Sequence, residues 1–565
     1  MLVSPTLMRF ALLPVCLTLA CATSPSRPTS AVDANGFTDS AKSAAAGIHG
    51  EAIASHIRFL ADDLLAGRDP GTHGYDVAAR YVASELQAIG VQPAGENGTY
   101  FQKVRFVRAT PTVGSLEVTG GTGAPVSFVK GENFVVLTDT DKGVTDVSAD
   151  LVFAGHGIAV PEYGYDDFAQ VDVKDKVVAI LAGAPRSDRP DFFPPLASAV
   201  YGQSERVAGD LTRRGARAII WIWPPAKEAI SPFTLVASNY AFDSMRLEDR
   251  PPLAPGLIVS TVAFDALLKQ AGRTETVADL VAASASGKAK GFEMGLKARV
   301  RRESKIRRIT SENVVGLLPG DPSSPTGKEM IVYGAHLDHM GIGKPVNGDN
   351  IYNGASDDAA GVASLLETAR AFTRLGHPPK RGILFVFVTA EERGLLGSEY
   401  FARHPTVPLE DVVADIDVDG AYPVHPLKDV VALGTDESSL GGDVARAAAA
   451  LGLIVSPDPE PEETYFVRSD NFNFVKKGIP AAQTFNGMAG LTPEQVTAER
   501  AFWRGRYHQP QDNFEPDRDW EPFAQLTRFN FLVGVSIAQA PARPAWNANS
   551  WFKRFPEPAR DGQPD

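Results

Sequence analysis

Three apolar segments, each followed closely by histidine or acidic side chains, constrain this chain more than any other feature. The segment Ile331–Ala335 precedes His336-Leu337-Asp338, Ile383–Val388 precedes Glu391-Glu392, and Val412–Val418 precedes Asp419. Such segments predict buried parallel strands. In open α/β sheets, ligands bind beyond the carboxyl ends of parallel strands. The sequence therefore predicts one edge of a sheet that carries a histidine and several carboxylates.

Two more segments fit the same edge. Asp357 and Asp358 stand just before an amphipathic helical pattern formed by Val362, Leu365, Leu366, Ala369 and Phe372. An acid at the start of a helix usually caps it, and we expect Asp358 to do only that. His508 lies in the turn-rich segment 507–512. A lone histidine in such a loop is more often a surface residue, so its assignment depends on the other residues.

Histidine, aspartate and glutamate without cysteine are typical of a zinc site. Two histidines and three carboxylates are enough for two zinc ions if one carboxylate bridges them. Two-metal sites hold their ions about 3.5–4 Å apart and divide the activation of water and the polarisation of substrate between them. The predicted chemistry is metal-assisted hydrolysis.

Four motifs in this order resemble a known family. They are His336-Leu337-Asp338, Ser356-Asp357-Asp358-Ala359-Ala360-Gly361, Ala390-Glu391-Glu392-Arg393-Gly394-Leu395-Leu396-Gly397-Ser398 and Tyr507-His508. The chain is similar to the co-catalytic di-zinc aminopeptidases, which include secreted bacterial leucyl aminopeptidases, yeast aminopeptidase Y and glutamate carboxypeptidase. The resemblance covers about 48–112 and 306–541. It implies an α/β zinc exopeptidase-like fold with a mostly parallel central sheet flanked by helices.

The resemblance also implies a role for each site residue. One zinc ion would be held by His336 and Asp419, and the other by Glu392 and His508. Asp357 would bridge the two ions. Glu391 would be the general base, and Asp338 would orient the ring of His336.

Three assignments stay open at this point. Asp415, Asp417 and Asp419 alternate along one strand; the length of the apolar segment favours Asp419 as the ligand, with Asp417 as the alternative. Asn471 stands where the family often has histidine near the substrate pocket, which leaves substrate preference open. His339 has no role in the family, and we expect it to be a surface residue or a residue that contacts a metal ligand without binding the metal.

Residues 113–305 differ in character from the segments on either side. Short β-rich runs at 151–154, 177–181, 218–222 and 257–259 alternate with helical patterns near 206–214 and 262–271, and His156 is the one histidine. The stretches 175–181 and 214–220 resemble the protease-associated domain inserted in this family; an unrelated β-rich insert is the alternative. Seven basic residues within 297–308 indicate either the solvated face of a strand, which we favour, or a patch for a polyanion.

The first 47 residues predict export. Phe10–Ala20 is apolar but too short to span a bilayer comfortably, so residues 1–21 are interpreted as a signal peptide. Ala20-Cys21 is similar to a bacterial lipoprotein cleavage site, which would lipidate Cys21; cleavage near Ala22 is the alternative. We expect residues 22–47 to form a flexible tether, and the protein to be a periplasmic or outer-membrane lipoprotein or otherwise secreted. In the tail, 542–565, Trp546 and Trp551 are candidate docking anchors.

The function predicted from these features is a zinc-dependent aminopeptidase acting on peptides with a free N-terminus. The formal net charge of −13 over 565 residues argues against nucleic acid as a partner, and a lipid at Cys21 would be the one link to a membrane. A carboxypeptidase is an alternative that requires basic side chains at the pocket. A third alternative is a non-catalytic binding protein on the same fold, like transferrin receptor. The loss of zinc ligands would indicate such a protein.

Overall fold

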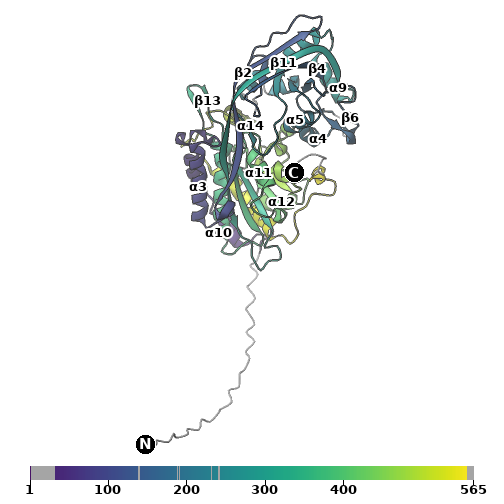
Figure 1. Ribbon diagram of the computed structural model, residues 1–565. Helices are drawn as coiled ribbons and strands as arrows, with labels where there is room; N and C mark the ends of the chain where they lie inside the picture. The colour runs from purple at the N-terminus through teal and green to yellow at the C-terminus, as the bar shows by residue number, and fades with distance from the viewer. Residues whose placement is uncertain are drawn as a thin grey trace.

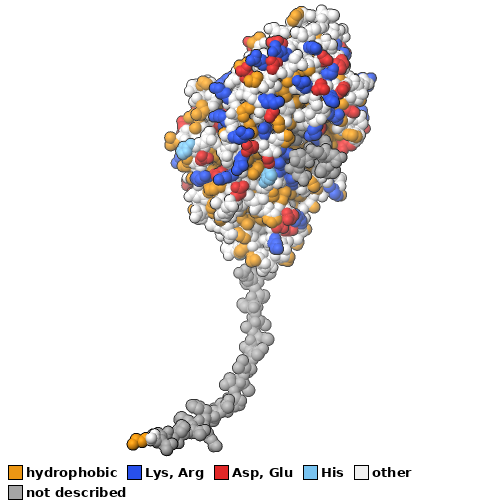
Figure 2. Space-filling view, viewed as in Figure 1, with side chains coloured by type: hydrophobic (Ala, Val, Ile, Leu, Met, Phe, Trp, Pro, Cys, Tyr) orange, Lys and Arg blue, Asp and Glu red, His pale blue; other side chains and the backbone are white. Residues whose placement is uncertain are grey.

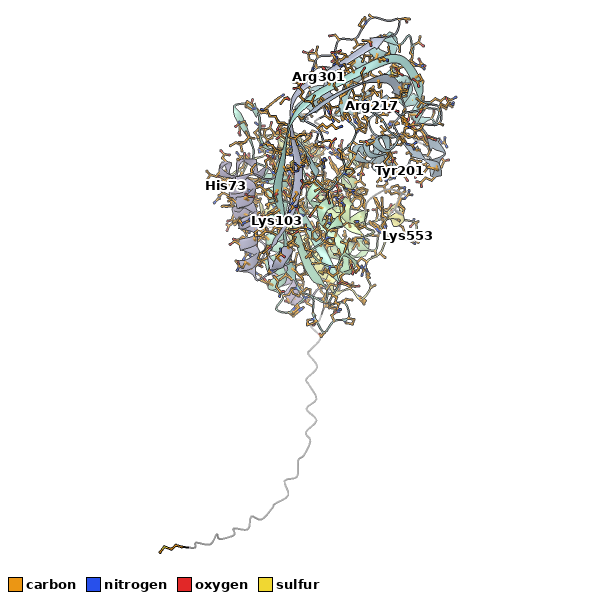
Figure 3. All side chains as sticks on the ribbon, in the orientation of Figure 1. His73, Lys103, Tyr201, Arg217, Arg301 and Lys553 are labelled. Atoms are coloured by element: carbon orange, nitrogen blue, oxygen red, sulfur yellow. The ribbon has the colours of Figure 1, made fainter. Side chains whose placement is uncertain are left out.

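The computed structural model describes residues 32–137, 140–187, 189, 191–230, 232–239 and 242–556, together with Met1. Two lobes share one sheet, which runs through both in the order β18-β17-β19-β16-β12-β15-β11-β4-β7-β8-β10-β3 (Figure 1). We call the lower lobe in Figure 1, where α3, α10, α11 and α12 are labelled, the catalytic lobe, and the upper lobe, where β4, α4, α5 and α9 are labelled, the insert lobe. Figure 3 labels His73 and Lys103 in the former and Arg217 and Arg301 in the latter.

The strands of the catalytic lobe include the three predicted apolar segments. They are β12 (Met330–His336), β15 (Gly382–Val388), β16 (Val412–Asp417), β17 (Asp429–Leu433), β18 (Ile454–Val455) and β19 (Ala481–Asn486). β12 pairs in parallel with β15 and with β16, and β16 pairs in parallel with β19. Every residue of β12, β15 and β16 is buried, as expected for parallel strands covered on both faces. The α/β fold with a mostly parallel central sheet is confirmed.

Helices cover both faces of this part of the sheet. They are α1 (Asp39–Ala46), α2 (Gly50–Leu60), α3 (His73–Ile89), α10 (Ala360–Thr373), α11 (Leu396–Arg403), α12 (Leu440–Ala450), α13 (Asn471–Val475), α14 (Pro493–Arg506) and α15 (Glu521–Gln539). The larger core joins apolar residues of α2, α3, α10, α12 and α15 to one face of the sheet. On the other face, Phe401 of α11 and Phe474 of α13 pack against Leu384 and Val386 of β15.

Two long strands join the lobes. β11 (Phe292–Leu318) pairs with β15 at its carboxyl end and with β4 along its first half, and β2 (Phe101–Gly120) runs antiparallel beside it. The basic run lies on β11. Lys297, Arg299 and Arg301 are exposed, as the solvated-face interpretation predicts. Arg302 is the exception, because its buried guanidinium donates to the main-chain carbonyl of Leu137 over 2.6 Å.

The insert lobe has a second parallel sheet segment with its own cores. Its strands are β3 (Phe134–Val136), β4 (Val144–Phe153), β7 (Val177–Leu181), β8 (Ala218–Trp223) and β10 (Gly256–Ser260). Its helices are α4 (Pro195–Tyr201), α5 (Ser204–Arg213), α6 (Pro225–Ile230), α7 (Phe233–Asn239), α8 (Thr261–Gln270) and α9 (Val277–Ala285). The remaining strands of the molecule, which are found in both lobes, are β1 (Gln92–Pro93), β5 (Ala159–Val160), β6 (Tyr165–Asp166), β9 (Ser244–Leu247), β13 (Gly341–Val346) and β14 (Asp349–Tyr352).

The segment predicted as a flexible tether is ordered in its last part. Residues 39–46 form α1, which begins at a Thr38 cap and buries Ala41, Ala44 and Ala45. Alanine is the strongest helix former, and its small side chain lets α1 lie close to the core, so the tether prediction is wrong for these residues. Cys16 and Cys21 lie outside the described residues.

The C-terminal segment docks on both lobes, as the two tryptophans predict. Trp546 donates its indole N–H to the carbonyl of Gly478, and Trp551 packs edge-on against Tyr201 of α4. Figure 3 labels Tyr201 and Lys553 on either side of this junction. In the part of the chain that the structure describes, no helix combines the length and apolarity needed to cross a membrane.

Candidate metal centre

His336, the last residue of β12, has its two ring nitrogens in different surroundings. Nδ1 lies 3.1 Å from the main-chain carbonyl oxygen of Asp338, so it donates its proton there. Nε2 is then free to bind a metal. It lies 2.9 Å from Oδ1 of Asp357 and 3.5 Å from Oδ1 of Asp419.

Asp338 holds the ring by a different contact from the one we expected. The ring nitrogen contacts its main-chain carbonyl, whereas the nearer carboxylate oxygen is 4.0 Å away. That oxygen instead accepts the main-chain N–H of Glu391 over 3.1 Å. Asp338 therefore links the ends of β12 and β15.

Asp357 lies between the two histidines. Its Oδ1 faces His336, and its Oδ2 lies 3.5 Å from Nε2 of His508. The carboxylate of Asp512 accepts the main-chain N–H groups of Ser356 and Asp357 at 2.9–3.0 Å, which anchors the segment just before α10. Nothing in the sequence pattern distinguished Asp512 from other loop acids.

Asp358 does more than cap α10. Its carboxylate accepts the N–H of Gly361 over 2.9 Å, as an acid at a helix start should. It also accepts the main-chain N–H of His336 over 3.2 Å. Asp358 therefore also holds the end of β12.

Glu391 and Glu392 follow β15 after a sharp change of backbone direction. Ala390 has a φ of 59°, a left-handed conformation that costs an alanine roughly 1–2 kcal/mol. Glu392 then places Oε2 3.0 Å from Nε2 of His508. One ligand-type atom each of Glu391, Glu392 and His336 lie within 4.8 Å of one another. Glu391 thus lies where the two halves of the site meet.

The structure favours Asp419 over Asp417 as a partner of His336. Asp419 belongs to the group of ligand-type atoms around His336 and Asp357. Asp417 is the last residue of β16 and is buried, and its Oδ2 contacts the hydroxyl of Ser469 at 2.6 Å. The same hydroxyl lies 2.7 Å from Oδ2 of Asp419. Ser469 therefore connects the two acids.

For His339 the sequence left two alternatives, a surface residue or one that contacts a metal ligand. Its side chain is completely buried, so the surface alternative is wrong. Nδ1 lies 2.6 Å from Oε1 of Glu392, the oxygen that does not face His508. His339, Asp357 and Glu392 form a group close enough to share an ion. The position of His339 beside Asp338 in the sequence did not predict its contact with Glu392.

Arg68 was also missed, although it supports two of the ligand-bearing loops. It is fully buried and donates to the main-chain carbonyls of Leu337, Asn353, Gly354 and Leu60 at 2.6–3.0 Å. It thereby ties the N-terminal segment to the loops after β12 and before α10. The turn-rich pattern around Gly67 predicted a loop there and no more.

The electrostatics of the site favour bound positive charge. Burial would lower the pKa of His336, but its contacts with Asp357 and Asp419 outweigh burial and raise it well above the usual value. Burial, together with the negative charges of Glu392 and Asp419, raises the pKa of Glu391 well above its usual value. For Glu392 burial acts in the same direction, but His508 and His339 outweigh it and lower its pKa well below normal.

The residues present fit a metal ion. Oδ2 of Asp357, Oε1 of Glu392 and both ring nitrogens of His339 are buried without a well-formed hydrogen bond. Burying such groups without partners is costly, and coordination to a cation removes that cost. The donor set, imidazole and carboxylate without thiolate, is one that zinc accepts.

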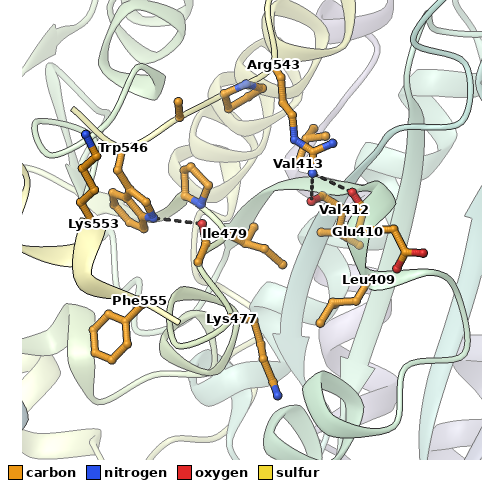
Figure 4. Close-up of a pocket in the computed structure, with 14 residues that line it drawn as sticks. Leu409, Glu410, Val412, Val413, Lys477, Ile479, Arg543, Trp546, Lys553 and Phe555 are labelled. Carbon is orange, nitrogen blue, oxygen red and sulfur yellow. Dashed lines mark hydrogen bonds between the residues drawn. The ribbon is translucent and has the colours of Figure 1, made fainter. Parts of the chain in front are cut away.

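A separate cavity of about 450 Å³ lies beneath the C-terminal segment, away from these residues (Figure 4). Its lining includes Trp546 and Arg543, whose guanidinium donates to the carbonyls of Glu410 and Val412. None of the candidate ligands lines it.

Comparisons with known proteins agree with this geometry. Residues 313–530 match the model of peptidase family M28. A vacuolar membrane protease of Aspergillus fumigatus is 33% identical over 193 residues, which are 34% of this chain and 17% of that protein. Leupeptin-inactivating enzyme 1 of Streptomyces exfoliatus is 28% identical over 205 residues, 36% of this chain and 41% of that one. The chain thus spans well under half the length of either relative.

The fold has a counterpart among solved structures. An aminopeptidase from Aneurinibacillus sp. strain AM-1 superposes with a TM-score of 0.52 at 19% identity, over 90% of this chain and 97% of that one. The matched family segment contains all five candidate ligands together with Glu391 and Asp338. The likeness to peptidase family M28 thus lies in residues 313–530, the segment that carries the candidate metal centre.

Proposed function

We propose that this metallopeptidase is a di-zinc aminopeptidase. The observation that carries the proposal is the position of Asp357, whose two carboxylate oxygens face one histidine each, His336 at 2.9 Å and His508 at 3.5 Å. A carboxylate shared in this way is what a bridging ligand requires. His336 and Asp419 would complete one zinc site, and Glu392 and His508 the other.

Two zinc ions held there would supply Lewis-acid polarisation of the scissile carbonyl and make water nucleophilic near neutral pH. Glu391 accepts the proton of the attacking water and passes it to the leaving amine. The N–H contact with Asp338 fixes the backbone of Glu391 beside His336.

His339 holds Glu392 from the side away from His508. The contact of its Nδ1 with Oε1 of Glu392 orients the carboxylate and leaves Oε2 for the metal. Partners of this kind typically change metal affinity by 10–100-fold when removed.

A carboxypeptidase of the same chemistry is the second candidate. The observation that favours it is a group of basic side chains in one cavity, including Arg468 and Arg393, the residue that follows Glu392 in the sequence. A non-catalytic binding protein is disfavoured, because all five candidate ligands and Glu391 are present. Export, an anchor at Cys21 and a protease-associated insert at 113–305 remain proposals from the sequence.

A panel of aminoacyl-nitroanilides, compared with N-blocked and C-terminal-type substrates, tests the proposal. We expect hydrolysis of free-amine substrates alone, lost on chelation and restored by zinc. Hydrolysis of N-blocked peptides from the C-terminus would replace the aminopeptidase with the carboxypeptidase. Full activity after exhaustive chelation would exclude a metal-dependent reaction.

A further inference from the structure

A cavity of about 730 Å³ lies between the two lobes. Its walls include Trp223 and Lys227 of the insert lobe, and Arg393, Gly394 and Arg468 of the catalytic lobe. The volume falls within the usual range for small-ligand sites. A short stretch of peptide fits a space of this size.

The cavity is strongly basic in an acidic protein. Three of the side chains that line it are acidic, Glu205, Glu399 and Glu463, and seven are basic, namely Arg186, Lys227, Arg246, Arg250, Arg302, Arg393 and Arg468. The whole chain carries a formal charge of −13. On the face shown in Figure 2, by contrast, basic and acidic side chains are interspersed. A concave site lined by one sign of charge concentrates ligands of the other sign.

Several of these basic side chains already have an acidic partner in an ion pair. Arg250 pairs with Glu399, Arg393 with Asp69, and Arg468 with Glu463. Lys227 is different: no ion pair joins it to a carboxylate of the described residues, and its ammonium lies 5.2 Å from the ring of Trp223. Burial first, and then the charges of Arg186 and Arg468, lower the pKa of Lys227.

Some residues that line the cavity are sequence neighbours of residues in the metal centre. Arg393 and Gly394, which line it, directly follow Glu391 and Glu392. Arg468, which also lines it, directly precedes Ser469, whose hydroxyl contacts Asp419. The cavity wall and two of the candidate ligands are thus carried by the same two loops.

We infer that this cavity binds a carboxylate on the leaving-group side of the substrate, so that the enzyme prefers short or acidic peptides. The inference rests on the proposed aminopeptidase function. Guanidinium and ammonium groups bind carboxylates through charge-assisted hydrogen bonds. The carboxylate is either the C-terminus of a short peptide or an acidic side chain, and substrates can distinguish the two.

The test compares kcat/KM for four peptides on the zinc-loaded full chain: Leu-Gly-Gly as the free acid, the same peptide as the amide, Leu-Asp-Gly amide, and N-acetyl-Leu-Gly-Gly acid. We expect the free acid to exceed its amide roughly tenfold, with the preference falling as salt rises. A matching gain for Leu-Asp-Gly amide assigns the cavity to any carboxylate, and no gain assigns it to the C-terminus.

Variants connect this preference to the cavity. Lys227→Met and the more exposed Arg468→Gln should each bring the acid-to-amide ratio closer to one. Lys288→Met removes the same charge from an exposed position outside the cavity and should keep the ratio. Circular dichroism and the thermal midpoint confirm that each variant is folded.

The outcomes separate the two proposals. Equal hydrolysis of acid and amide by the wild type, or an unchanged ratio in both cavity variants, overturns the carboxylate site and leaves the aminopeptidase intact. Cleavage of the N-acetylated peptide alone contradicts the aminopeptidase. No cleavage of any of the four peptides would overturn both.

Discussion

The two lobes both contain parallel strands, yet only one carries a candidate metal centre. In the insert lobe β4, β7, β8 and β10 are also parallel, and β7, β8, β10 and the last three residues of β4 are buried except for Trp223. His156 follows β4. There Nδ1 of His156 donates to the carbonyls of Leu181 and Gly183, and burial lowers its pKa to about 4. Among the described residues, the three groups able to share an ion all lie in the catalytic lobe.

The difference shows what turns the edge of a sheet into a metal site. Position at the carboxyl ends of parallel strands is common to both lobes. In the insert lobe the histidine is neutral and satisfied by the main chain, and Asp167 accepts the N–H groups of His156 and Ile158. In the catalytic lobe histidine nitrogens face carboxylates, of which Oδ2 of Asp357 and Oε1 of Glu392 have no hydrogen-bond partner. The site is distinguished less by its place in the sheet than by a cluster of buried carboxylate oxygens and imidazole nitrogens that have no hydrogen-bond partner.

The largest expected effect is on Glu391. Glu391→Gln removes the proton acceptor but keeps the shape of the side chain, so turnover should fall on the order of 10²–10⁴ while zinc content stays unchanged. Glu392→Gln is the matched control, since it alters a metal ligand: zinc content should fall, and excess zinc should restore part of the activity. Metal analysis and turnover of both proteins give the result. Near-normal turnover of Glu391→Gln, or loss of its zinc while Glu392→Gln keeps zinc, would reverse the two roles.

His339 should affect metal affinity rather than the proton transfer. His339→Phe fills the same buried space without a donor to Glu392, and zinc affinity should fall roughly 10–100-fold. His339→Asn retains an N–H donor and should recover part of the loss. Competition with a chelator of known affinity measures both. An unchanged affinity for the Phe variant would show that the contact with Glu392 has no role in the site.

Arg68 tests whether the catalytic edge depends on support from the N-terminal segment. Arg68→Met leaves four buried carbonyls without their donor, which should lower the free energy of unfolding by roughly 3 kcal/mol or more. Arg80→Met, which breaks the pair between the exposed Arg80 and Glu312, is the control and should cost less than about 1 kcal/mol. Denaturant unfolding of both variants tests this; equal losses would contradict the role assigned to Arg68.

The smallest effect is expected in the insert lobe. His156→Ala should leave zinc content and turnover unchanged, because His156 bonds to main-chain carbonyls and faces no ligand. If this substitution has an effect, it should be a lower thermal midpoint of unfolding. Loss of one zinc equivalent from this variant would remove the distinction between the lobes.

The sequence predicted the strands and the residues at their ends because both depend on local patterns. Apolar runs show buried strands, and the acids and His336 follow them directly. The contact between His339 and Glu392 could not be predicted in this way, because it joins two loops after different strands. Arg68 was missed for the same reason: its acceptors are main-chain carbonyls, which no side-chain pattern reveals. The helix at 39–46 was obscured by a composition that also suits a linker.

The most direct test of the central claim is the number of zinc ions bound by the metal-free protein. Titration should give two equivalents for the wild type, about one each for His336→Gln and His508→Gln, and weakened binding of both ions for Asp357→Asn. A single equivalent in the wild type, or an Asp357→Asn protein that binds two ions as tightly as the wild type, would contradict a shared two-metal centre.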